Sequence, residues 1–81
     1  MIYLYILKLD YKTYYTGITN NMFRRMRKHR TKKSISTKHA TYIELMHIEC
    51  FKNRKEAHKK EVYIKNKGAK RYLLMTRFAN Y

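Results

Sequence analysis

The amino-acid sequence predicts an α+β fold, in which a small three-stranded antiparallel sheet is flanked by helices in the order ββαβαα. Three segments are rich in the aliphatic and aromatic residues typical of strands. The remaining segments carry helix caps or apolar residues at helical spacing. The chain of 81 residues is long enough for one domain, so we expect residues 1–81 to form a single domain with a thin core.

The first two strands are predicted over residues 2–10, which are rich in Ile, Leu and Tyr, and over residues 12–18, where Tyr and Thr prevail. The polar segment between them, around residues 10–13, is short, which predicts a β-hairpin. It lacks the Asn-Gly or Asp-Gly pair favoured in tight hairpins, so the turn type stays open.

The first helix is predicted over residues 19–30, where either Asn20 or Asn21 could accept hydrogen bonds from the amides of the first turn. Residues 31–40 are basic and show no clear period, which indicates a loop. Residues 41–51 are β-branched and apolar, which predicts the third strand.

Two further helices are predicted over residues 53–67 and 69–78. The first of them begins like a capping box, with Asn53 as the cap and Glu56 three residues later. Gly68 follows its last residue and is a natural C-terminal stop.

The charge of the chain points to an anionic partner. Lysine and arginine outnumber the acidic residues by 20 to 5, which gives a formal net charge of +15. A compact chain with this charge repels itself. Nucleic acid is the first candidate partner, and an anionic membrane surface is the second.

The single cysteine, Cys50, excludes an internal disulfide framework and a cysteine-based zinc site. A chain without disulfides favours a reducing, intracellular compartment. The first residues are apolar for only seven positions before Lys8, so they form neither a signal peptide nor a membrane span. We therefore expect a cytoplasmic protein without a membrane partner.

The predicted first helix has an inward face that carries polar groups. Met22, Met26 and His29 are spaced i, i+4 and i+7, so they form one stripe that should face the sheet. Arg25 lies one turn before His29 at the edge of this stripe. Either Arg25 only extends its charge to solvent and His29 is a satisfied border residue, or both belong to a site.

The second predicted helix places a carboxylate on its apolar face. Ala57, Glu61 and Ile64 share one stripe, with Glu61 in the middle. A carboxylate there needs a cation, hydrogen bonds or a metal ion, because an isolated buried charge is costly. A salt bridge with Arg25 or another basic residue would satisfy it as well as a metal would.

The predicted hairpin brings two tyrosines toward these groups. Tyr5 and Tyr15 can lie on neighbouring strands, and Gly17 follows Tyr15 on the same face. A glycine there removes a side chain and allows a close approach to the backbone. We expect a shallow site that combines both phenols with Arg25, His29 and the Glu61 carboxylate.

At these residues the sequence resembles the GIY-YIG endonuclease superfamily, and most of all its small single-domain bacterial YhbQ-like group. Residues 3–5 (YLY) take the place of the GIY element, and residues 15–17 (YTG) that of the YIG element. The arginine and histidine of the motif fall on Arg25 and His29. The metal-binding glutamate of the family falls on Glu61.

The resemblance implies a GIY-YIG nuclease fold and the hydrolysis of phosphodiester bonds in DNA with one divalent metal ion, Mg²⁺ or Mn²⁺. Glu61 would hold the metal, and Arg25 would clamp the non-bridging phosphate oxygens. Tyr5 would activate water, and Tyr15 would position water or phosphate. His29 would orient Tyr5 or shuttle a proton. Since nearby cations favour phenolate, we expect them to lower the pKa of Tyr5.

Four basic residues are candidates for binding nucleic acid: Arg24, Arg27, Lys28 and Lys38. The resemblance further implies low sequence specificity, a branched or damaged DNA substrate, a role in DNA repair or recombination, and a location at the nucleoid. Two alternatives remain. One is a nucleic-acid-binding module of the same fold with weak or no cleavage, and the other is an unrelated basic RNA-associated protein.

Overall fold

The predicted order of elements is confirmed by the computed structural model, which describes residues 1–35 and 37–79, the last three of these by their backbone alone. The predicted boundaries lie within two residues of the observed ones except at the start of the first helix, which begins at Met22, three residues later than predicted. The elements are β1 (Ile2–Leu9), β2 (Thr13–Thr19), α1 (Met22–Arg30), β3 (Ile43–Phe51), α2 (Arg54–Lys67) and α3 (Ala69–Ala79).

The three strands form one antiparallel sheet in the order β2-β1-β3, so β1 is central. Tyr5 pairs with Gly17, and Leu7 pairs with Tyr15. Because side chains alternate between the two faces of a strand, these four residues share one face of the sheet. The register therefore brings both tyrosines together over the glycine.

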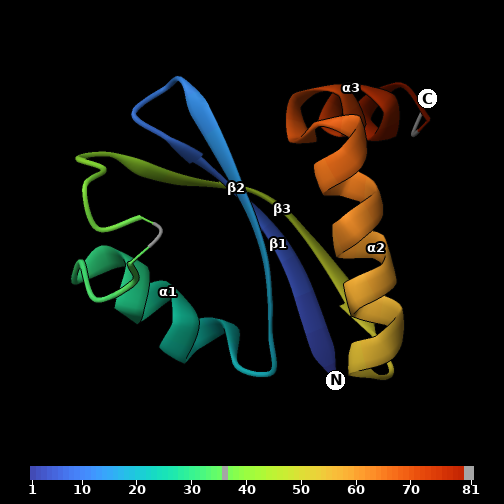
Figure 1. The fold of residues 1–81 in the computed structure, drawn as a ribbon, viewed down its shortest axis with the longest axis horizontal. Coiled ribbons are helices and arrows are strands. Elements are labelled where there is room, and N and C mark those ends of the chain that lie inside the picture. Colours follow the sequence, from blue (N-terminus) through green and yellow to red (C-terminus); the bar gives the residue numbers. More distant parts are fainter. Residues whose placement is uncertain (36, 80–81) are drawn as a thin grey trace.

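The helices cover opposite faces of the sheet (Figure 1). Leu4 and Ile6 pack against α2 and α3 through Ile64 and Tyr72. The opposite face, which carries Tyr5, packs against α1 through Met22 and Met26; its other buried members are Leu7, Leu9 and Ala40. The strand β2 forms one edge of the sheet and lies between α1 and α2. Side chains from both helices can therefore meet at this edge.

The hairpin turn has an unusual backbone and a long-range support. Asp10 and Tyr11 have φ angles of 50° and 62°, as in type I′ turns, although neither residue is a glycine. The Asp10 carboxylate accepts hydrogen bonds from the amides of Thr41 and Tyr42, each at 2.8 Å. The Tyr11 ring stacks on the Tyr42 ring at 4.5 Å. These contacts offset the cost of the left-handed conformation.

Side-chain caps fix where α1 and α2 begin. The N-cap of α1 is Asn21 rather than Asn20, and its side chain accepts from the Arg24 amide at 3.0 Å. Asn53 caps α2 in the same way by accepting from the Glu56 amide at 2.9 Å. Gly68 ends α2 with a φ of 100°, a value that side chains disfavour.

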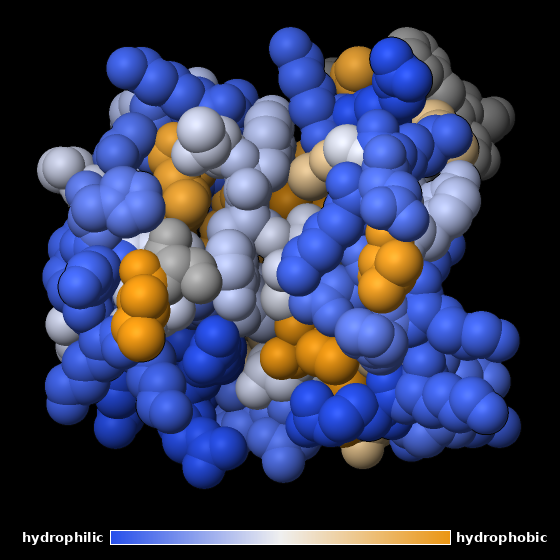
Figure 2. All heavy atoms as spheres, viewed as in Figure 1, coloured by the Kyte–Doolittle hydropathy of each residue, from blue (hydrophilic) through white to orange (hydrophobic). Residues whose placement is uncertain are grey.

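The surface reflects the composition. Figure 2 shows hydrophilic residues over α1 on the left and α2 on the right, with a paler strip between them over β2. Within residues 1–35 and 37–79, no helix has both the length and the apolar character needed to cross a membrane.

Candidate active site

Four of the predicted site residues form one hydrogen-bonded network on the α1 face of the sheet. The Arg25 Nε donates to the Tyr5 hydroxyl at 3.0 Å, and its Nη2 donates to the Tyr15 hydroxyl at 3.3 Å. The Tyr5 hydroxyl also lies 3.0 Å from His29 Nε2. The arginine thus joins two phenols, and one phenol joins it to the imidazole.

Gly17 is required by this packing. A Cβ atom at Gly17 would lie 2.7 Å from the Tyr5 hydroxyl oxygen, which is closer than real Cβ contacts, and 3.0 Å from the Tyr15 ring, which is tighter than most of them. Its φ is not positive, so the glycine provides space rather than backbone freedom. The expected close approach over Gly17 is made by the two tyrosine rings of the protein itself.

The hydrogen bonds of His29 assign its tautomer. Because the Tyr5 oxygen already accepts from Arg25, its own proton can go to His29 Nε2. The other ring nitrogen, Nδ1, then carries a hydrogen and donates to Thr37 Oγ1 at 2.6 Å. Burial, and next the charge of Arg25, lower the pKa of His29, which keeps the ring neutral.

Thr37 was not predicted as part of the site. It lies in the basic connection between α1 and β3, yet it is fully buried. The segment around Thr37 has no periodic pattern of apolar residues, so the sequence does not indicate that this threonine is buried. Its role follows only from the packing of this connection against α1 and β1.

The expectation of a lowered pKa for Tyr5 is wrong. Tyr5 is fully buried, and burial raises its pKa to about 12, although the hydrogen bond from Arg25 acts in the opposite direction. Removal of a phenolate from water outweighs one nearby cation. Tyr15 is only half-buried, so its hydroxyl is the one of the two that can meet a substrate.

Glu61 occupies the predicted inward stripe of α2 but is not bonded to the network. Ala57 and Ile64 are fully buried, and the side chain of Glu61 is 13% exposed. Its carboxylate pairs with His58 Nδ1 at 3.2 Å and Lys65 Nζ at 3.3 Å, both on the same helix. The salt bridge considered between Glu61 and Arg25 does not form, because Arg25 donates to the tyrosines instead.

The expected five-residue cluster is therefore divided by the sheet. The phenols, Arg25 and His29 lie on the α1 face, whereas Glu61 belongs to α2, which packs against the opposite face. Within the described part of the chain, no three His, Cys, Asp or Glu side chains lie close enough together to hold a metal ion by protein ligands alone. A single half-buried carboxylate suits Mg²⁺, which keeps several of its waters and takes ligands from substrate phosphates.

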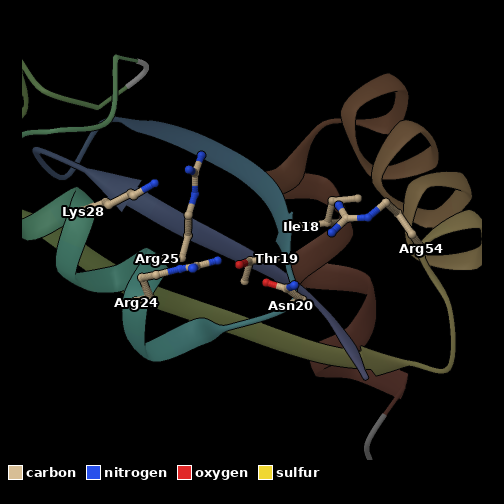
Figure 3. A pocket seen from close by; sticks show the side chains of 7 residues that line it. All are labelled: Ile18, Thr19, Asn20, Arg24, Arg25, Lys28 and Arg54. Atoms are coloured by element: carbon tan, nitrogen blue, oxygen red, sulfur yellow. The ribbon is translucent and has the colours of Figure 1, made fainter.

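A cationic cavity of about 200 Å³ lies beside the network, at the end of β2 (Figure 3). Its basic lining comes from Arg24, Arg25 and Lys28 of α1 and from Arg54 of α2. The hydrogen bond to Tyr5 raises the pKa of Arg25, so this residue stays charged. Two of the predicted nucleic-acid-binding residues, Arg24 and Lys28, thus line the same cavity as Arg25. Arg54 was missed, because only the tertiary fold brings the start of α2 there.

The other two predicted binding residues lie away from this cavity. The Arg27 guanidinium lies 5.3 Å above the Phe23 ring and lines an apolar groove between α1 and β3 that includes Leu45 and Ile48. Lys38 is exposed in the connection between α1 and β3. Neither residue shares the cavity lining with Arg25.

Comparison with known proteins agrees with the motif. Residues 1–73 match the model of the GIY-YIG catalytic domain. A UPF0213 protein of Clostridium perfringens is 38% identical over 66 residues, which cover 80% of this chain and 71% of that protein. A UPF0213 protein of Haloquadratum walsbyi is 35% identical over 65 residues, which cover 79% of this chain and 73% of that protein.

The fold has a counterpart among solved structures. The solution NMR structure of a UPF0213 protein from Bacillus halodurans matches with a TM-score of 0.60 and 26% sequence identity. The match covers 96% of this chain and 85% of that one. The resemblance noted in the sequence is thereby confirmed at the level of both domain and fold.

Proposed function

Because the chain belongs to the GIY-YIG catalytic domain family, a family of nucleases in general, we propose that it hydrolyses phosphodiester bonds in DNA with one divalent metal ion. One observation carries the proposal. Arg25 is held between two tyrosine hydroxyls at the wall of a cationic cavity, which is an arrangement suited to a phosphate.

Arg25 is the group that we assign to the reacting phosphate. Its Nε and Nη2 are directed by Tyr5 and Tyr15, and the guanidinium keeps further N–H donors that these bonds do not use. Donors that are fixed before the substrate arrives can stabilise the charge that develops on the non-bridging oxygens. Lysine at this position would lose both the second hydrogen bond and the planar orientation.

The surroundings of the two phenols favour different roles for them. Tyr5 has no exposed surface and a raised pKa, so we assign it to holding Arg25 and His29 in place. Tyr15 accepts from Arg25 and is only half-buried, so its hydroxyl can be reached by a substrate. We therefore assign to Tyr15, rather than to Tyr5, the contact with attacking water or with phosphate. In this scheme Tyr15 first loses its hydroxyl proton to solvent, and the phenolate then takes a proton from the attacking water. As the water oxygen bonds to phosphorus, the bond from phosphorus to the leaving oxygen breaks, and that oxygen is protonated by solvent water.

Glu61 is the residue that would hold the metal, Mg²⁺ or Mn²⁺. Glu61 lies on α2, which packs against the face of the sheet opposite to the one that carries Tyr5. A divalent ion bound there would stabilise negative charge on the phosphate and on the leaving oxygen. The protein itself would contribute the single carboxylate and the donors of Arg25.

The test compares cleavage of supercoiled, single-stranded and branched DNA in the presence of Mg²⁺, Mn²⁺ or a chelator. We expect metal-dependent cleavage by the native chain and none by Glu61→Ala, with DNA binding retained in both. Arg25→Lys should lower the rate by about 100-fold or more. Arg71→Gln, an exposed change on α3, is the matched control and should cleave normally. Equal cleavage by Glu61→Ala and the native chain would show the metal assignment to be wrong.

A second candidate is a nucleic-acid-binding module of the same fold with weak or no cleavage. The ion pairs of Glu61 with Lys65 and His58 favour this second function. A carboxylate whose charge is already compensated by a neighbouring cation binds a metal ion less strongly. Salt-sensitive binding without cleavage under any metal would support this function.

The substrate and setting follow from the same site. The described residues assign no helix or strand to base recognition, and the cavity contacts would be to phosphate. We therefore propose low sequence specificity or recognition of DNA structure, such as branched or damaged DNA. DNA repair or recombination at the nucleoid would be the corresponding role.

A further inference from the structure

The cavity at the end of β2 is built by two helices that cover opposite faces of the sheet. Arg24, Arg25 and Lys28 reach it from α1, and Arg54 reaches it from the first position of α2. Figure 3 shows the Arg54 side chain extended from α2 toward β2, on the opposite side of the strand from the α1 residues. The uncharged part of the lining consists of Ile18, Thr19 and Asn20.

The charges around this cavity are not balanced by the protein. None of the seven lining residues is acidic. The three ion pairs found among the described residues involve Glu49 and Glu61 and none of the four cations. Like charges that converge on a small space repel one another, so an anion bound there would be stabilised by all four.

The size and charge of the cavity select one kind of phosphate. A cavity of about 200 Å³ has room for a phosphate group and several waters. An internal phosphodiester carries one negative charge, whereas a phosphate monoester carries about 1.5 to 2 near pH 7. Four cations around space for one phosphate match the monoester better.

We propose that this cavity binds the terminal phosphate monoester of a broken DNA strand, so that strand ends at nicks and gaps are the substrate class of the site. The proposal rests on the proposed action on DNA. Arg25 lines the cavity and also bonds Tyr15, so it can contact both the terminal phosphate in the cavity and the neighbouring internal phosphodiester that reacts beside Tyr15. Arg54 becomes a substrate-binding residue that holds the end from the α2 side.

The experiment measures binding in chelator, where no cleavage is required. Duplexes of one sequence carry a nick or gap whose end bears a 5′-phosphate, a 3′-phosphate or only hydroxyls, and fluorescence anisotropy gives the affinities at one salt concentration. We expect the native chain to bind at least one phosphorylated end about tenfold more tightly than the hydroxyl end, the size of one charge-assisted hydrogen bond. The 5′ and 3′ arms identify which end is held.

Arg54→Gln should abolish this preference and bind all the duplexes with the affinity of the hydroxyl end. Arg71→Gln removes an equal charge from the exposed face of α3, away from the cavity lining, and should keep the native preference for phosphorylated ends. Arg24→Gln is the second cavity variant if Arg54→Gln does not fold.

Equal affinity of the native chain for phosphate and hydroxyl ends would overturn the proposal. A preference that persists in both Arg54→Gln and Arg24→Gln would also overturn it, since the phosphate would then lie elsewhere. Glu61→Ala separates this proposal from the nuclease proposal. Its preference for phosphorylated ends should equal that of the native chain, whether or not the native chain cleaves DNA.

Discussion

Tyr5 and Tyr15 carry the same phenol, yet the residues around them give the two hydroxyls different properties. The Tyr5 hydroxyl is shared between Arg25 and His29 inside the protein, and burial raises its pKa to about 12. The Tyr15 hydroxyl accepts a hydrogen bond from Arg25, which lines the cavity. At the scale of single residues, one phenol supports the structure of the site, and the other is the one that we propose to meet the substrate.

Replacement of each tyrosine by phenylalanine separates these roles. Tyr5→Phe leaves His29 Nε2 buried without its partner, so we expect the free energy of unfolding to fall by about 1–3 kcal/mol. Tyr15→Phe should change stability by less than about 1 kcal/mol but should remove most of the cleavage activity. Urea denaturation and the cleavage assay measure the two effects. Full activity in Tyr15→Phe would contradict the assignment.

The neutral state of His29 predicts a dependence of stability on pH. Its pKa in the folded chain is lower than the unfolded value of about 6.5. As the pH falls below about 6.5, the unfolded chain therefore takes up the proton first. The stabilising contribution of neutral His29 is complete above this pH and is lost as the pH falls through the folded-state pKa.

The measurement is the free energy of unfolding of the native chain and of His29→Gln at pH 7.5 and pH 5. The native chain should lose more stability between these values than the variant does. His39, His47 and His58 are present in both proteins, so their contributions cancel in the comparison. Parallel losses in the two proteins would show that His29 does not titrate as described.

At the scale of elements, the two glycines of the chain act through different physics. Gly68 ends α2 with a φ of 100°, and a Cβ atom there would meet nothing within 4 Å. Gly17 lies in β2 with ordinary dihedrals, but a Cβ atom there would collide with both tyrosines. Gly68 is needed for its backbone conformation, and Gly17 is needed because no room is left for a side chain.

We therefore expect Gly68→Ala to cost about 1–3 kcal/mol of stability through backbone strain, while the folded protein remains fully active. Gly17→Ala should displace the rings of Tyr5 and Tyr15 and should impair cleavage even under conditions in which the chain stays folded. Thermal denaturation followed by the cleavage assay at a permissive temperature distinguishes the two variants. Native activity in folded Gly17→Ala would contradict the role assigned to the close packing.

The elements were predictable from the sequence because their signals are local. Strand composition, the Asn53 cap, Gly68 and the stripe through His29 each depend on residues within a few positions of one another. The hairpin turn was not predictable, since Asp10 and Tyr11 adopt positive φ with support from Tyr42, which is distant in the sequence.

The candidate site was predictable only in part for the same reason. Short motifs locate Arg25, His29 and both tyrosines, and the stripe on α2 locates Glu61. The pKa of Tyr5 depends on burial, which outweighs the nearby cation and is a property of the packed structure. Arg54 and Thr37 join the site through tertiary contacts, which no pattern of residue spacing in the sequence reveals.

At the scale of the whole molecule, the net charge of +15 acts on folding and binding in opposite directions. The molecule measures 33 × 27 × 22 Å along its principal axes. The screening length is about 30 Å at 0.01 M salt and about 10 Å at 0.1 M, so repulsion spans the protein only in dilute salt. Added NaCl should therefore raise the thermal midpoint while it weakens DNA binding.

Thermal denaturation and anisotropy titrations between about 0.01 M and 0.2 M NaCl check this pair of trends. Binding that is independent of salt would exclude phosphate contacts as the main source of affinity. A midpoint that does not rise would mean that self-repulsion contributes little to the stability of the fold.

The bond between Asp10 and the amides of Thr41 and Tyr42 has a consequence for the order of folding. It closes a loop of more than thirty residues, whereas the hairpin of β1 and β2 forms between neighbours in sequence. Contacts across long loops carry a larger entropic cost and form later. The same connection carries Thr37, so the partner of His29 arrives only when this loop docks. Assembly of the network is then a late event, and hydrogen exchange at Thr41 and Tyr42 would report the opening of the site separately from the unfolding of the sheet.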